Sequence, residues 1–135
     1  MSRFLPVIVI FFGAIFQSCS PKLVSTDSGL EYTILEKSKK GKAIEKGMEV
    51  EAHCILTLAD GKKIWSTYDD NRTFKFTYGQ TRLIDGFNEI VSYLHEGEKV
   101  RVSIPSELGY GSRGAGRDIP PDSDLIFEIK VLNVE

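Results

Sequence analysis

The sequence has few of the residues that metal, thiol or proton-transfer chemistry requires. It contains two cysteines and two histidines, and no group of them has the spacing of a metal site. The G-x-S-x-G motif of serine hydrolases is absent, and no pair of acids stands out for general acid–base catalysis. An enzyme built on this chain would therefore work without proton transfer, and we expect no metal and no cofactor.

The chain also lacks an excess of one charge. Its 17 basic and 19 acidic residues leave a formal net charge of -2. Nucleic-acid-binding proteins usually carry a basic face or tail, so no nucleic-acid partner is expected. With 135 residues, 41% of them hydrophobic, the chain has room for one ordinary globular domain.

The long apolar run at the amino terminus is too short to be a membrane-spanning helix. It covers residues 4–16, whereas a helix needs about 20 residues to cross a bilayer. Arg3 precedes it, and small and polar residues follow, which is typical of a secretory signal peptide. The sequence FQSC, ending at Cys19, resembles a bacterial lipobox, whose cysteine receives a diacylglycerol. We expect a signal peptide at residues 1–18 and lipid attachment at Cys19; an uncleaved signal anchor and a soluble secreted form are the alternatives.

The segment that follows this cysteine is short and polar. Residues 20–29 read SPKLVSTDSG, so residues 19–29 are predicted to be the lipid-anchor cysteine and a short tether. The domain itself would occupy residues 30–135. Lipid on Cys19 would attach it to a membrane in the bacterial cell envelope, facing the periplasm or the secreted side.

Apolar residues alternate with polar ones through most of the remaining chain. Between Val50 and Leu58 nearly every second residue is apolar, which is the period of a strand with one buried face. Cys54 would point inward there as a small apolar side chain. Similar stretches occur at residues 30–37, 74–79, 99–105 and 125–135.

One stretch has the period of a helix instead. Phe87, Ile90, Val91 and Leu94 form an apolar stripe, and Gly97 would end the helix. The sequence therefore predicts an α+β fold, with about five antiparallel strands and one short helix lying on the sheet.

The glycine-rich stretch at residues 109–114 matches the pattern G-x-G-x-x-G of nucleotide-binding loops. The residues after it include Pro120 and Pro121 and favour no helix, so nothing would present a helix amino terminus to a phosphate. We interpret these glycines as part of a long irregular loop between two strands, which is usually functional. A pocket between sheet, helix and loop could collect several aromatic residues: Phe74, Phe76, Phe87, Tyr110 and Phe127.

Four segments after residue 50 follow one another in the order of a known family. They read LADGKKIWS, FKFTYGQTRLIDGFNEIV, LHEGEKVRVSIPSELGYGSRG and IPPDSDLIFEIKVLNVE. In these segments the chain resembles the FKBP-type peptidyl-prolyl cis–trans isomerases, from about Val50 to Glu135. The resemblance implies a twisted antiparallel sheet wrapped around one short helix, with a pocket between helix and sheet.

The resemblance also implies roles for individual residues. Tyr110 would offer its hydroxyl to one substrate carbonyl, Ile84 would offer its backbone N–H to another, and Phe127 would close one side of the pocket. The other implied substrate-binding residues are Phe74, Leu83, Phe87, Ile119, Cys54, Ile64 and Trp65.

Three of these positions depart from the family pattern. Cys54 replaces a pocket tyrosine, and Ile64 replaces an aromatic residue. Trp65 stands where the family has an aspartate that orients the tyrosine hydroxyl, and an indole can donate a hydrogen bond but cannot accept one. Phe87 also takes the place of a tryptophan at the base of the pocket.

Two functions are compatible with this resemblance. One is an isomerase that accelerates rotation about X–Pro bonds in exported proteins, as a membrane-anchored folding helper. The other is an FKBP-like module with little or no turnover, which binds proline-containing segments or an envelope protein partner. In both cases proline-containing polypeptides are the expected ligands.

Overall fold

The computed structural model describes residues 20–135 as one sheet with a helix on its face. The predicted signal peptide and Cys19 lie outside the described residues. The elements are β1 (Leu23–Ser25), β2 (Glu31–Glu36), β3 (Glu49–Leu58), β4 (Lys63–Ser66), β5 (Phe74–Thr77), α1 (Asp85–Val91), β6 (Lys99–Ile104), the 3₁₀ helices η1 (Ser106–Leu108) and η2 (Gly111–Arg113), and β7 (Leu125–Val134). Within residues 20–135, no helix is long and apolar enough to span a membrane.

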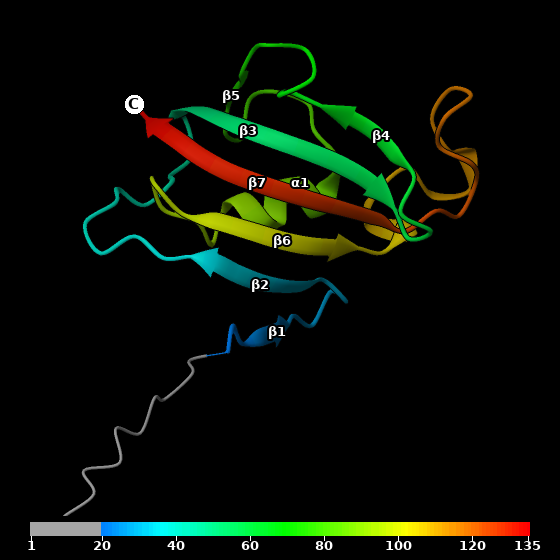
Figure 1. The fold of residues 1–135 in the computed structure, drawn as a ribbon, viewed down its shortest axis with the longest axis horizontal. Coiled ribbons are helices and arrows are strands. Elements are labelled where there is room, and N and C mark those ends of the chain that lie inside the picture. The colour runs from blue at the N-terminus through cyan, green and yellow to red at the C-terminus, as the bar shows by residue number, and fades with distance from the viewer. Residues whose placement is uncertain (1–19) are drawn as a thin grey trace, which may run out of the picture.

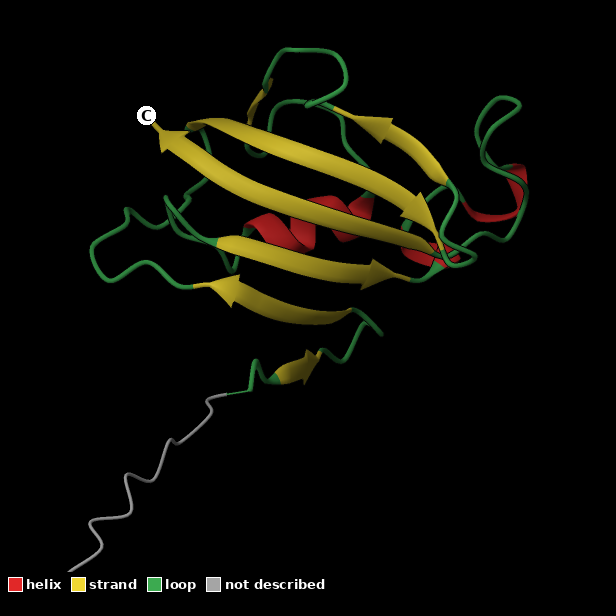
Figure 2. Cartoon of the chain, viewed as in Figure 1, coloured by secondary structure: helices red, strands yellow, loops and turns green. Residues whose placement is uncertain are grey.

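The strands form one antiparallel sheet with the order β1-β2-β6-β7-β3-β4, and β5 pairs with β3. The helix α1 crosses one face of this sheet, behind β6 and β7 in the view of Figures 1 and 2. This confirms the predicted α+β fold, a twisted antiparallel sheet wrapped around one short helix. The sheet has seven strands rather than about five, because β1 has only three residues and β4 places Ile64 and Trp65 side by side, so neither shows an alternating pattern in the sequence.

The first strand lies inside the segment that the sequence predicts to be a tether. Residues 23–25 pair with β2, and the Ser28 hydroxyl donates a hydrogen bond to the Glu89 carboxylate on α1 at 2.7 Å. The folded sheet therefore begins at Leu23 rather than at Leu30. Pairing with β2 holds this strand in place, although its own sequence carries no strand signal.

The core lies between α1 and the inner face of the sheet. The inward-facing residues of β3, which are Val50, Ala52, Cys54, Leu56 and Leu58, are all buried, as their period of two predicts. The apolar stripe Phe87, Ile90, Val91 and Leu94 is buried as well. The helix ends at Val91, earlier than the stripe suggested, and Leu94 packs into the core from the turn that follows it.

The helix approaches the sheet closely at Gly86, near its first turn. A Cβ atom on Gly86 would overlap Cγ2 of Ile104, a fully buried residue of β6. Ile104 is β-branched and enclosed on all sides, so it has few ways to move aside. The absence of a side chain at Gly86 thus lets the amino-terminal end of α1 rest directly on the sheet.

Gly86→Ala is expected to lower the free energy of unfolding by about 1–3 kcal/mol, because overpacking a dense core forces neighbours out of their rotamers. Helix propensity alone predicts the opposite sign, a gain of up to about 1 kcal/mol. Urea unfolding followed by circular dichroism measures the difference. In an Ile104→Ala background the same substitution should cost less, since the overlapping methyl group is absent. A Gly86→Ala variant more stable than the wild type would contradict the close approach.

Candidate active site

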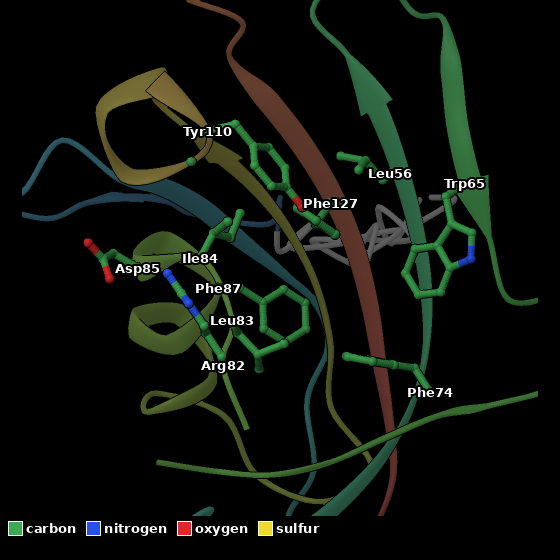
Figure 3. A pocket seen from close by; sticks show the side chains of 11 residues that line it. Leu56, Trp65, Phe74, Arg82, Leu83, Ile84, Asp85, Phe87, Tyr110 and Phe127 are labelled. Carbon is green, nitrogen blue, oxygen red and sulfur yellow. The ribbon is translucent and has the colours of Figure 1, made fainter. Parts of the chain in front are cut away.

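A cleft of about 610 Å³ lies between α1, the sheet and the loop that joins β6 to β7. Figure 3 shows side chains from all of these elements directed toward it. Its lining consists of Leu56, Trp65, Phe74, Arg82, Leu83, Ile84, Asp85, Phe87, Gly109, Tyr110 and Phe127. This volume and an apolar lining with few polar groups are typical of sites for small ligands or short peptide segments.

Phenylalanine rings packed edge to face form the base of the cleft. The Phe87 ring on α1 lies 5.3 Å from the Phe127 ring on β7, at an interplanar angle of 73°. It lies 5.6 Å from the Phe76 ring and 6.1 Å from the Phe74 ring, both on β5. Such aromatic contacts stabilise ring positions beyond simple burial. The base is therefore rigid and apolar, and it excludes water from below.

Sheet register brings the side walls together. On β3, Leu56 lies opposite Phe127 of β7 and opposite Trp65 of β4. All three residues line the cleft, so this one row across three strands forms its sheet side. Leu56 was not among the sequence-predicted site residues. The signal for it was present, because it is the next inward-facing position after Cys54 on the same strand.

Two hydrogen-bond donors at the cleft have no partner within residues 20–135. The Tyr110 hydroxyl makes no such bond. Tyr110 directly precedes η2 in the loop between β6 and β7, and its ring reaches into the cleft. The backbone N–H of Ile84, the residue that caps α1, makes none either, although its carbonyl accepts bonds from Phe87 and Asn88. A ligand with two carbonyl groups could therefore bind both donors in apolar surroundings.

Comparison with known proteins identifies the family to which this arrangement belongs. The family model for FKBP-type peptidyl-prolyl cis-trans isomerase matches residues 40–132. The chain belongs to the FKBP-type peptidyl-prolyl cis-trans isomerases. Proteins of this family are isomerases. Two relatives of this chain, from Drosophila melanogaster and Mus musculus, carry the name peptidyl-prolyl cis-trans isomerase.

Relatives and solved structures agree with this assignment. A FK506-binding protein of Neisseria meningitidis is 42% identical over 94 residues, which are 70% of this chain and 86% of the relative. FK506-binding protein 2 of Aspergillus fumigatus is 37% identical over 129 residues, covering 94% of this chain and 93% of the relative. The crystal structure of FkpA from Escherichia coli is 31% identical with a TM-score of 0.77, covering 84% of this chain and 51% of that chain. The crystal structure of AtFKBP13 is 28% identical with a TM-score of 0.78, and the match covers 84% of this chain and 99% of that chain.

Trp65, which the sequence resemblance places at the position of the family's aspartate, stands at the side of the cleft. Its ring packs edge to face against Phe74 at 5.7 Å. The indole N–H donates a hydrogen bond to Asp70 at 3.1 Å, and Figure 3 shows the indole nitrogen on the side away from Tyr110. The contacts with Phe74 and Asp70 thus hold the indole at the side of the cleft, and the ring does not fill the cleft.

Seven of the ten implied substrate-site residues line the cleft, and Cys54, Ile64 and Ile119 do not. On β3, Cys54 lies opposite Ile129 of β7, one inward-facing row away from the cleft. Burial raises the pKa of the Cys54 thiol to about 12, so this side chain acts as an apolar filler and is not a nucleophile at neutral pH. Ile119 is buried in the β6–β7 loop, where it pairs with Ala115.

The fluorescence of Trp65 should report occupation of the cleft. It is the single tryptophan of the chain, and a bound proline-containing peptide would displace water from its exposed face. We expect a saturable blue shift of its emission when such a peptide is titrated into the full chain. The same peptide with alanine in place of proline serves as the control and should leave the emission unchanged. Binding detected by calorimetry without any change in emission would place the ligand elsewhere.

Proposed function

We propose that this chain accelerates cis–trans rotation about X–Pro bonds in exported proteins, as a folding helper anchored to a membrane of the bacterial cell envelope. The observation that supports it most is the open apolar cleft of about 610 Å³, which has Trp65 in its lining. Rotation about an X–Pro bond is slow enough, at tens of seconds or more, to limit the folding of a protein. A catalyst for this step would therefore assist proteins that fold after export.

The chemistry depends on the electronic structure of the peptide bond. Delocalisation of the nitrogen lone pair makes the bond planar and separates charge, which gives a rotation barrier of about 18–20 kcal/mol. The twisted form has lost this delocalisation and carries less separated charge. An apolar cleft floored by Phe87 and Phe127 therefore disfavours the planar form more than the twisted one, and stronger binding of the twisted form is catalysis.

The two donors would hold the ends of the substrate while the bond turns. The Ile84 N–H would bind one substrate carbonyl and the Tyr110 hydroxyl a second one. Neither group transfers a proton, so both act by position and by hydrogen bonding alone. The apolar surroundings strengthen these bonds, because water competes for them less.

Removal of the Tyr110 hydroxyl tests this arrangement. Tyr110→Phe should lower kcat/KM about 2- to 10-fold in a protease-coupled prolyl-peptide assay on the full chain in mild detergent, which is the effect of one lost hydrogen bond. Tyr93→Phe is the matched control. Its hydroxyl donates to Glu89, away from the cleft lining, so its kcat/KM should equal that of the wild type.

Turnover by the wild type no faster than in buffer would overturn the isomerase proposal. If peptide still shifted the Trp65 emission, the chain would instead be the binding module with little turnover. One observation favours that second function: the Tyr110 hydroxyl has no acceptor to orient it within residues 20–135. A gain of activity in Trp65→Asp would then assign the loss to the indole.

The membrane anchor is proposed from the sequence alone, since Cys19 lies outside the described residues. The lipobox-like FQSC supports acylation of this cysteine. Each buried methylene of an acyl chain contributes about 0.8 kcal/mol to membrane binding, so several chains on one cysteine give stable attachment. Because β1 already begins at Leu23, the domain would lie close to the membrane.

Labelling with a fatty acid in a bacterial host tests the anchor. We expect the label on the wild-type chain and its complete loss in Cys19→Ala, since no other residue would carry the acyl chain. Cys54→Ala is the matched control and should keep the label, because Cys54 is buried in the folded domain. Label that remained on Cys19→Ala would contradict lipidation at this residue.

A further inference from the structure

The peptide unit between Leu83 and Ile84 stands at the entrance of α1, and both residues line the cleft. A peptide unit is planar, and in the trans form its C=O and N–H groups point in opposite directions. The described chain contains no cis peptide bond. The direction of the Leu83 carbonyl therefore determines the direction of the Ile84 N–H.

The Leu83 carbonyl is held by a side chain of the helix. Nδ2 of Asn88 donates a hydrogen bond to it at 3.3 Å, from the residue next to Phe87 on α1. The backbone N–H of Asn88 donates to the Ile84 carbonyl at 3.1 Å. One residue thus binds two successive carbonyls, and between them it leaves the Ile84 N–H without a partner in residues 20–135.

The Asn88 side chain makes this bond at a cost. Its Oδ1 atom is buried and has no hydrogen-bond partner among the described residues. A buried acceptor left unpaired destabilises the fold, whereas leucine has nearly the same shape and no polar atom to satisfy. Packing alone therefore gives no reason for an amide at this position. The hydrogen bond from its Nδ2 atom to the Leu83 carbonyl does give one.

We propose that Asn88 is a positioning residue for the isomerase reaction. By binding the Leu83 carbonyl it turns the peptide unit so that the Ile84 N–H stands ready for a carbonyl of the bound prolyl peptide. A donor fixed in advance needs no reorganisation when the substrate binds, and this is what makes such hydrogen bonds effective. The proposal rests on the proposed function, because it assigns a cause to the geometry of that same site.

Two substitutions remove the donor and nearly keep the shape. Asn88→Leu and Asn88→Asp should each lower kcat/KM about 3- to 10-fold in the prolyl-peptide assay on the full chain, the effect of one weakened hydrogen bond. Asn88→Leu should be at least as stable as the wild type in urea, since it removes the unpaired Oδ1. A role in stability alone predicts that activity and stability fall together.

Nuclear magnetic resonance gives a measurement that a change in stability alone would not alter. In the wild type the amide proton of Ile84 should shift downfield when a proline-containing tetrapeptide is added to saturation. In the Asn88 variants this shift should be smaller, because the N–H is no longer held in one direction. Should Asn88→Leu fail to fold, Asn88→Asp carries the same test.

Asn133→Leu is the matched control. Asn133 lies on β7, and its side chain donates a hydrogen bond to Glu135 outside the cleft lining, so neither kcat/KM nor the Ile84 shift should change. Wild-type activity together with an unaltered Ile84 shift in both Asn88 variants would overturn the positioning role and leave the isomerase function intact. A wild-type chain without turnover would instead overturn the proposed function itself.

Discussion

The packing of α1 on the inner face of the sheet is the contact on which the cleft depends. Gly86 lets the first turn of the helix rest against Ile104, and Phe87, the next residue, then meets the rings on β5 and β7. A helix held further out would open the base of the cleft to water and would move Ile84 away from the sheet. Both the apolar floor and the backbone donor thus follow from one close approach between helix and strand.

The cleft is apolar because its base contains no charged or polar side chains. Its base consists of carbon atoms, and the charged groups of its lining, Arg82 and Asp85, belong to exposed residues. In the proposed reaction such surroundings favour a bond that becomes less polar as it twists, and this reaction needs no ionised group and no nucleophile. The thiol of Cys54 lies one inward-facing row from the cleft. Burial raises its pKa to about 12, so it stays protonated at neutral pH. The proposed site therefore relies on shape and on the two donors of Ile84 and Tyr110.

Much of the fold could be predicted because burial leaves a period in the sequence. The alternation in β3 and the stripe from Phe87 to Leu94 record which side of each element faces the core. Two strands left no such record: β1 has only three residues, and in β4 the apolar residues Ile64 and Trp65 are adjacent rather than alternating. The resemblance to a family supplied seven residues of the cleft lining, but it also suggested Cys54, Ile64 and Ile119, which lie outside that lining.

The amino-acid sequence by itself determined the α+β class, the inward-facing residues and the family, because local periods and ordered motifs survive without any knowledge of contacts. The tertiary structure decided which inward-facing residues reach the cleft. Leu56 and Cys54 have the same orientation on one strand, yet only Leu56 lies in the row with Trp65 and Phe127. The register of β3 with β4 and with the distant β7 sets that row, and the hydrogen bond from Asn88 to Leu83 likewise depends on how the helix begins in space. Neither is encoded in a pattern of neighbouring residues.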